Sequence, residues 1–264
     1  MMLSRSVYWY KSKLDDGLVI EKLQDMSEKR PTDGFWKMYY RIRREGLEWN
    51  HKRIHRVYKL LKLNMKRKGK RRLPMRILQP LEAVNAINVC WSMDFMSDAL
   101  LTGRKLRTFN VIDDFNREAL AIEIDTSLPA ERVIRVLDQV INWRGKPRRI
   151  RVDNGPEFIS SKLGMWCEDK GICLQFIQPG KPMQNGYIER FNGSFRRDVL
   201  DAYLFENLSQ VRMLTEDWMD DYNYSRPHDA LQGRSPMDML AVDLWKTSRR
   251  VSHKPTADNN NDNL

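Results

Sequence analysis

The chain has 264 residues, of which 41% are hydrophobic and 31% are charged, so it has room for one large domain or two modest ones. Its formal net charge of +11 favours a polyanionic partner, and no apolar run approaches the roughly 18 residues that span a membrane. Three cysteines without Cys-x-x-Cys spacing, and no secretory leader, exclude a disulfide scaffold and predict free thiols in a reducing cytoplasm.

Residues 1–65 are predicted to be helical and basic. Apolar residues recur at helical spacing from Phe35 to Ile42 and again from Ile54 to Leu61. Gly46 is placed to end the first of these helices, and Asn50 is placed to cap the second. Two short helices with a tight turn, the second of them basic, are typical of a helix-turn-helix and equally of a helical hairpin with a solvated basic face. The candidate DNA contacts on the second helix are Lys52, Arg53 and Arg56.

Residues 66–88 are predicted to form an extended basic linker. The segment opens with seven residues, 66–72, that contain six cations and no acid, and Pro74 and Pro80 follow. Such a run repels itself and commonly lies along DNA phosphates, which gives salt-sensitive affinity without sequence preference. The candidate DNA contacts here are Lys66, Arg67 and Lys68.

From residue 89 to residue 245 the pattern becomes that of a mixed α/β sheet with further helices at its C-terminal end. The cysteines, Cys90, Cys167 and Cys173, are expected to fill core positions as small hydrophobes. Residues 246–264, rich in Asn and Asp, are predicted to be a disordered tail. The expected strands are 89–96, 107–114, 118–126, 148–152 and 172–177, and the expected helices between them are 129–143 and 160–170.

Three acids from separate elements are candidates for one site. Asp94 interrupts an apolar, strand-like run, Asp153 follows another, and Glu189 lies in a helical stretch, with thirty-five residues between it and Asp153. An acid in an apolar run is costly to bury unless a cation or a donor meets it. Carboxylates suit Mg²⁺ or Mn²⁺, and two such ions about 3.5–4 Å apart can clamp the attacking and leaving oxygens of a phosphoryl displacement. Each acid alone also has an ordinary interpretation, as part of an Asp-Asn-Gly turn, a strand edge or a solvated helix face.

The residues around Glu189 suggest contacts with DNA. The segment 179–182, Pro-Gly-Lys-Pro, is predicted to be irregular. Asn185, Asn192 and Arg196 stand four before, three after and seven after Glu189, which places all four on one helix face. An arginine here offers a fork that matches phosphate geometry. The candidate DNA contacts are Lys181, Asn185, Arg190 and Arg196.

Several other polar residues near the proposed site are interpreted as structural. Asp113 and Asp114 end an expected strand, and Glu157 is placed to hold a loop or a water; Asp98 is read in the same way. His228, in a Ser-Arg-Pro-His segment, is expected to be a packing or capping residue rather than a general base.

The motifs resemble those of OrfB-type insertion-sequence transposases of the IS-three family, from about residue 3 to about residue 245. The resemblance is carried by Trp-Ser-Met-Asp-Phe-Met at 91–96, Asp-Asn-Gly-Pro-Glu-Phe at 153–158, Gln-Pro-Gly-Lys-Pro-Met-Gln-Asn-Gly at 178–186 and Tyr-Asn-Tyr-Ser-Arg-Pro-His at 222–228. Asp94, Asp153 and Glu189 are similar to the DDE triad of transposases and retroviral integrases, including the thirty-five-residue gap.

This resemblance implies a ribonuclease H-like core, in which the first and fourth strands are neighbours, preceded by a small all-α helix-turn-helix-like region. It implies that the triad holds two Mg²⁺ or Mn²⁺ ions, cleaves the element's 3′ ends and transfers them to a target. The implied partners are double-stranded DNA, further copies of the chain on that DNA, and an upstream-frame partner or fusion.

Two other functions stay open from the sequence. A ribonuclease H-type nuclease would only hydrolyse, and a non-catalytic DNA-binding regulator of transposition would not cleave at all. The three acids argue against the regulator, and the basic linker with the Arg226-Pro-His228 segment favours joining of ends over hydrolysis alone.

Overall fold

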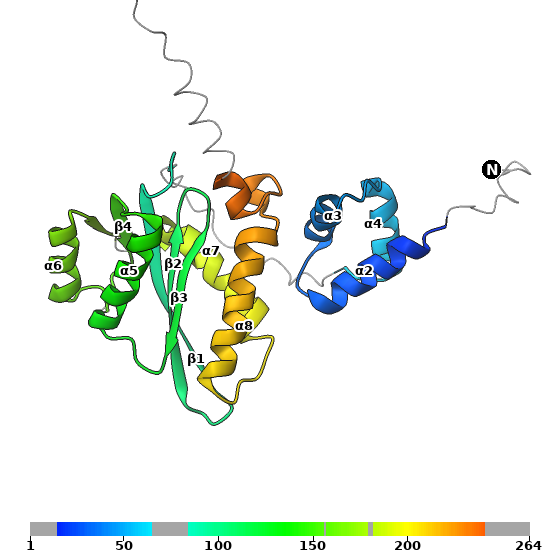
Figure 1. Cartoon of the computed structure of the whole chain (residues 1–264). Helices are drawn as coiled ribbons and strands as arrows, with labels where there is room; N and C mark the ends of the chain where they lie inside the picture. Colours follow the sequence, from blue (N-terminus) through cyan, green and yellow to red (C-terminus); the bar gives the residue numbers. More distant parts are fainter. Residues whose placement is uncertain (1–14, 65–83, 156, 179–181, 241–264) are drawn as a thin grey trace, which may run out of the picture. The chain divides into compact units, whose positions relative to one another are not determined.

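A computed structural model describes residues 15–64, 84–155, 157–178 and 182–240 (Figure 1). The chain divides into two compact units, Met1–Leu73 and Pro74–Leu264. The expected tail at 246–264 and most of the expected linker lie outside the described residues, and so do four candidate DNA contacts, Lys66, Arg67, Lys68 and Lys181. In the described part, no helix is both long enough and apolar enough to cross a membrane.

Three helices lie in the described part of the N-terminal unit, α2 (Gly17–Lys29), α3 (Phe35–Arg44) and α4 (His51–Leu60). The sequence predicted a helical region here without separating α2. Asn50 caps α4 as predicted, because its side chain accepts a hydrogen bond of 2.9 Å from the Lys52 amide. The apolar faces of the three helices form one core, which includes Val19, Leu23, Met38, Ile42, Ile54 and Val57.

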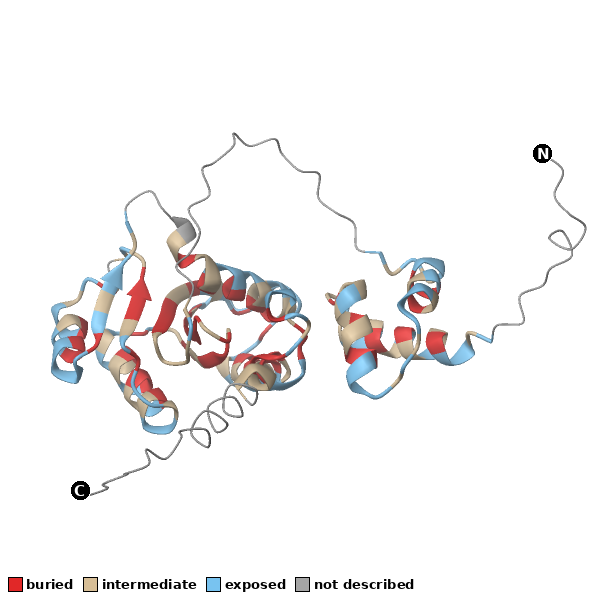
Figure 2. Cartoon of the chain, turned by 90° about the horizontal axis from the view of Figure 1, so that it is seen from above, coloured by how far each residue is buried: buried red, intermediate tan, exposed pale blue. Residues whose placement is uncertain are grey.

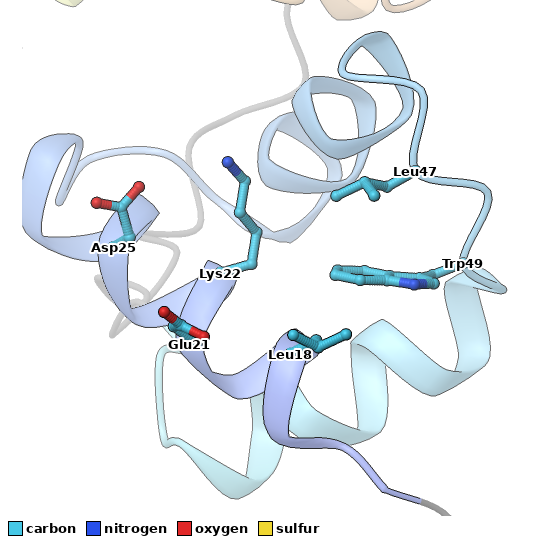
Figure 3. A pocket seen from close by; sticks show the side chains of 6 residues that line it. All are labelled: Leu18, Glu21, Lys22, Asp25, Leu47 and Trp49. Atoms are coloured by element: carbon cyan, nitrogen blue, oxygen red, sulfur yellow. The ribbon is translucent and has the colours of Figure 1, made fainter.

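A pocket of about 320 Å³ opens on the surface of this helical unit (Figure 3). Figure 3 shows the Trp49 ring lying between Leu18 and Leu47. Lys22 also lines the pocket, and its ammonium pairs with Glu45 at 2.5 Å. Glu21 and Asp25 complete the lining, so an apolar floor has a charged rim.

The C-terminal unit is built on a five-stranded mixed sheet with strand order β3-β2-β1-β4-β5. The first three strands pair antiparallel, whereas β4 pairs parallel with both β1 and β5. The prediction that the first and fourth strands are neighbours is therefore confirmed. The strands are β1 (Cys90–Ala99), β2 (Lys105–Asp113), β3 (Ala119–Asp125), β4 (Arg149–Val152) and β5 (Cys173–Phe176).

Helices cover both faces of the sheet. Figure 1 shows α5 (Ala130–Arg144) and α6 (Ser161–Lys170) on one side of the strands, with α7 (Gly186–Phe195) and α8 (Leu208–Asp220) on the other. Figure 2 shows buried residues along the strands and on the inner sides of these helices. The two faces form separate clusters, one including Trp91, Phe109 and Leu137 and the other including Ile112, Phe195 and Trp218.

Alternation along β1 decides which face each side chain meets, because successive side chains of a strand point to opposite faces. Trp91 and Met93 pack in the cluster of α5 and α6, and Met96 packs in the cluster of α7 and α8. Asp94 shares its face with Met96. The sheet therefore presents Asp94 to α7.

One core assignment from the sequence is wrong. Cys90 and Cys167 are buried as expected, but Cys173 is exposed. Cys173 begins β5, which is an edge strand of the sheet, and most of that strand is exposed. An edge strand has no neighbour on one side, so an apolar-looking run there does not guarantee burial.

Candidate active site

Asp94 lies in the middle of β1 and is held by two donors. The Phe95 amide donates to its Oδ1 at 2.8 Å, and the Asn192 side chain of α7 donates to its Oδ2 at 2.7 Å. The Asn192 carbonyl oxygen accepts in turn from the Asn110 side chain at 2.7 Å. Asn110 is the partner of Asp94 in the β1–β2 register. A line of hydrogen bonds therefore runs from β2 through α7 to Asp94 and fixes its carboxylate.

The environment of Asp94 disfavours its charged form. Burial is the largest cause, and repulsion from Asp153 and Glu189 adds to it; together they raise the pKa of Asp94 from 3.8 to about 6. The hydrogen bonds from Phe95 and Asn192 act in the opposite direction without cancelling this effect. Three acids that are distant in the sequence thus interact electrostatically at Asp94, on the central strand of the sheet.

Asp153 follows the last residue of β4 and begins a tight turn. Its Oδ1 accepts from the Gly155 amide at 3.0 Å, which is the local bond of an Asx-turn. Asp153 therefore forms the turn expected of an Asp-Asn-Gly sequence, and this does not conflict with its place in the candidate site. A Cβ on Gly155 would lie 2.9 Å from both Asp153 Oδ1 and Glu157 Oε2, so an alanine here would require these carboxylates to move.

The loop after Asp153 is attached to the sheet at two points. Phe158 is buried, and its ring lies 5.0 Å from that of Phe95 on β1. Glu157 pairs with Arg107 of β2 at 2.5 Å, and the Arg107 guanidinium lies 4.8 Å above the Phe95 ring. The loop-holding role considered for Glu157 matches this contact.

Glu189 lies in the first turn of α7 and is exposed. Its negative charge contributes to the raised pKa of Asp94. Its carboxylate does not, however, lie close enough to the two aspartates to form a three-ligand metal site with them. Among the described residues, no three His, Cys, Asp or Glu side chains are grouped closely enough to hold a metal ion. The structure thus brings the three acids into electrostatic range and leaves the third on the outer side of the site.

The other expected contacts around α7 differ in their accessibility. Arg190 is exposed. Arg196 donates to the Ser97 carbonyl oxygen at 2.9 Å and lies 3.6 Å from Asp98, so it is partly engaged with the end of β1. Asn185 precedes the helix, in the short turn Pro182–Asn185, and is only 3% exposed. Its side chain is therefore covered in this structure, and its contact with DNA stays a prediction.

The expected DNA contacts on α4 also differ. Lys52 is exposed in the first turn of the helix. Arg53 and Arg56 both pair with Asp16, at 3.0 and 2.6 Å. The acid that precedes α2 thus engages two of the three cations, a contact that the periodicity of α4 does not reveal.

Two residues near Asp94 were not singled out as site residues, Asn110 and Arg107. The available signal was weak. Asn110 is a polar residue inside the apolar run Phe-Asn-Val-Ile of the second strand, and a buried amide there requires a partner. His228 packs edge-on against Tyr222 with ring centroids 4.6 Å apart, as its interpretation as a packing residue predicts.

Comparison with known proteins identifies the family. Two models of the integrase core domain match residues 85–182 and 170–236. The chain is 38% identical over 258 residues to a 31.7 kDa protein of the insertion element IS407 from Burkholderia multivorans, which covers 97% of this chain and 90% of that protein. The chain belongs to the insertion-sequence transposases with an integrase core domain. It is therefore a polynucleotidyl transferase.

Two further likenesses agree with this assignment. The transposase is 25% identical over 223 residues to the putative transposase InsK of the Escherichia coli element IS150, with 80% of this chain and 78% of that protein covered. Its fold also matches a chain of the simian T-cell lymphotropic virus intasome, at a TM-score of 0.52 and 15% identity over 72% of this chain and 66% of that one. The predicted ribonuclease H-like fold is confirmed.

Proposed function

We propose that Asp94, Asp153 and Glu189 are the catalytic carboxylates of this transposase and that they bind divalent metal. The observation that supports this most directly is the electrostatic interaction of the three acids at Asp94, whose pKa burial and charge repulsion raise to about 6. Several negative charges in a half-buried site destabilise the folded protein unless a cation or a proton neutralises them, so such a cluster indicates a functional site.

The donor set fits Mg²⁺ or Mn²⁺, because all three ligands are hard carboxylate oxygens. Asp94 and Asp153 would share two ions, and Glu189 would complete the second. Glu189 is exposed on α7, so a change of its side-chain rotamer would be required to bring the third carboxylate to the ions. Bound there, the ions would lower the pKa of a water and neutralise charge that develops on the phosphoryl oxygens.

The reaction would proceed in two displacements at phosphorus. In the first, a water oxygen bonds to the phosphorus at the element's end, and the bond from phosphorus to the 3′ oxygen breaks, leaving a 3′-hydroxyl. In the second, that hydroxyl attacks a target phosphodiester and displaces another 3′ oxygen. The task of the protein residues is positioning, and the hydrogen bonds from Phe95 and Asn192 hold Asp94 for it.

Double-stranded DNA, as element ends and as target, is the proposed substrate. Lys52 and Arg190 are exposed and available to phosphate, whereas Arg53, Arg56 and Arg196 would exchange protein partners for phosphate. Joining of two ends requires at least two copies of the chain on the DNA. An upstream-frame partner or fusion remains a prediction from the resemblance.

One assay tests the proposal and separates it from the two alternatives. The full chain is incubated with Mg²⁺ or Mn²⁺ and duplexes that carry the element's ends. Joined products are expected; nicks without joining would indicate a hydrolytic nuclease, and a gel shift without cleavage would indicate a regulator.

The matching variants are Asp94→Asn, Asp153→Asn and Glu189→Gln, each expected to abolish cleavage and to leave the gel shift measurable. Asp138→Asn is the control, because Asp138 lies on α5, on the opposite face of the sheet, and pairs with Lys170. Cleavage that survives in any triad variant would remove that residue from the site.

A further inference from the structure

Asp114 is a buried acid outside the triad that bonds to both strands carrying the aspartates. It follows the last residue of β2 and is 1% exposed. Its Oδ1 accepts from the Ser92 hydroxyl of β1 at 2.6 Å, and its Oδ2 accepts from the Arg151 guanidinium of β4 at 3.0 Å. Its backbone amide donates to the Cys90 carbonyl oxygen at 2.9 Å. The Asp114 carboxylate, at the end of β2, thus connects the neighbouring strands β1 and β4.

The two residues that it joins face each other in the sheet. Ser92 of β1 and Arg151 of β4 are partners in the parallel register. Asp94 stands two residues beyond Ser92, and Asp153 stands two residues beyond Arg151. Since side chains alternate, each aspartate follows its strand partner on the same face. The bridge therefore lies one pleat, about 7 Å, before the two aspartates.

The pairing of β1 with β4 is short and gives little register information by itself. Only three residue pairs connect the strands, and Ser92–Arg151 is the last of them before Asp153. Strand β4 has four residues, and the last three of them, Ile150 to Val152, are buried. If β4 slipped by two residues against β1, every side chain would stay on its face of the sheet. Asp153 would then move by about 7 Å along the strand direction relative to Asp94.

A buried ion pair is a poor stabiliser but a good determinant of register. Removing Asp114 and Arg151 from water costs energy that apolar side chains of similar volume would not require. A displaced strand, however, would leave both charges without a partner in the core. The pair Asp114–Arg151, with side chains 0% and 5% exposed, therefore penalises every alternative register strongly.

We propose that Asp114 is a positioning residue, which sets the spacing of Asp94 and Asp153 by locking Ser92 and Arg151 in register. The inference rests on the proposed role of the two aspartates. The carboxylate of Asp114 bonds to Ser92 and Arg151 and not to either aspartate, and its burial keeps it away from solvent. Its effect is on metal affinity and on the rate of cleavage, through the distance between two carboxylates that must share ions.

The test uses the full chain and measures Mn²⁺ affinity without DNA, by the paramagnetic resonance signal of free Mn²⁺. Asp114→Asn is expected to weaken Mn²⁺ binding by about 10–100-fold, the usual effect of losing an outer partner of a ligand. Asp114→Asn leaves the buried Arg151 guanidinium without this carboxylate, whereas Ser92→Ala and Arg151→Lys weaken the bridge and keep one charge opposite the other. These two variants therefore serve where Asp114→Asn does not fold. Each is expected to weaken Mn²⁺ binding by a smaller factor than Asp114→Asn.

Asp113→Asn is the matched control. Asp113 is the preceding residue and is equally buried, but its carboxylate accepts from the Asn88 and Phe115 amides and from no side chain of β1 or β4. It should change thermal stability and leave Mn²⁺ affinity within twofold of wild type. An equal loss of affinity in Asp113→Asn, or wild-type affinity in folded Asp114→Asn and Ser92→Ala, would overturn the proposal. Cleavage that persists in Asp94→Asn would instead overturn the proposed function.

Discussion

The substitution Asp94→Asn is expected to stabilise the metal-free protein at neutral pH while it abolishes cleavage. In the folded state the pKa of Asp94 is raised to about 6 from 3.8, mainly by burial and further by the charges of Asp153 and Glu189. A shift of about two pKa units corresponds to an upper bound of about 3 kcal/mol in the free energy of unfolding. Asparagine has one acceptor oxygen for the two donors, Phe95 and Asn192, so one of these hydrogen bonds is lost at a cost of about 1 kcal/mol. We therefore expect a net gain of about 1–2 kcal/mol above pH 6.

The sign of the pH dependence follows from proton binding. Between pH 3.8 and 6 the folded state retains a proton on Asp94 that the unfolded state has lost, so wild-type stability falls as pH rises through this window. Below pH 3.8 the carboxyl is protonated in both states and the penalty disappears. The stability of Asp94→Asn relative to wild type should therefore increase from pH 4 to pH 7 and stay constant above it.

Urea unfolding in EDTA at several pH values measures this difference. Asp125→Asn is the control with the opposite sign, because the Thr126 amide, Arg132 and Arg212 outweigh burial and lower the pKa of Asp125. That variant should be less stable than wild type at neutral pH, and the loss should shrink as pH falls through 3.8. Mg²⁺ should stabilise wild type and have no such effect on Asp94→Asn. A difference between Asp94→Asn and wild type that does not change with pH would refute the electrostatic account.

Three further outcomes are expected. Asn192→Ala should slow cleavage by about 10–100-fold, because Asp94 loses the side chain that orients it, and single-turnover rates at saturating DNA measure the loss; wild-type rates would contradict the hydrogen-bond geometry. Gly155→Ala should reduce Mn²⁺ affinity, since the new methyl would lie 2.9 Å from Asp153 Oδ1, whereas Gly164→Ala, where a Cβ meets nothing within 4 Å, should leave it unchanged. Cleavage at subsaturating Mg²⁺ should rise with pH through about 6, as Asp94 loses the proton that competes with metal, and a profile that is flat between pH 5 and 7 would exclude this titration.

Much of the fold was readable from local pattern. The strands before and after the α5 helix were predicted within a few residues because apolar alternation and turn residues are local signals. The largest difference is at the end of β1, which continues to Ala99 because Ala99 pairs with Lys105 in the hairpin. The residues beyond Met96 are polar or small, and no apolar pattern marks them as a strand. The burial of Cys173 was wrong for a related reason, since a position at the sheet edge is not visible in four residues of sequence.

In the candidate site, too, some residues could be predicted from local sequence pattern and others could not. The three acids were identifiable because each interrupts or follows a recognisable element and their spacing resembles a known triad. The side-chain network around them was not, because its members come from distant segments, as Asn192 does for Asp94. Asn110 reaches Asn192 across 82 residues, and Arg107 reaches Glu157 across 50. A polar residue in an apolar strand indicates that its side chain requires a hydrogen-bond partner. Which residue is the partner depends on the elements that the fold places side by side.

By itself, the sequence determined that this transposase has a mixed α/β core, which acids are candidates for its site, and in which elements they lie, because periodicity and residue type act over a few neighbouring positions. Only the tertiary structure decided that Asp94 is raised in pKa, that Glu189 stays on the outside, that Asn185 is buried, and that Asp114 ties the two aspartate-bearing strands together. These properties depend on distances between segments that chain order leaves open, and on the removal of water that only packing achieves.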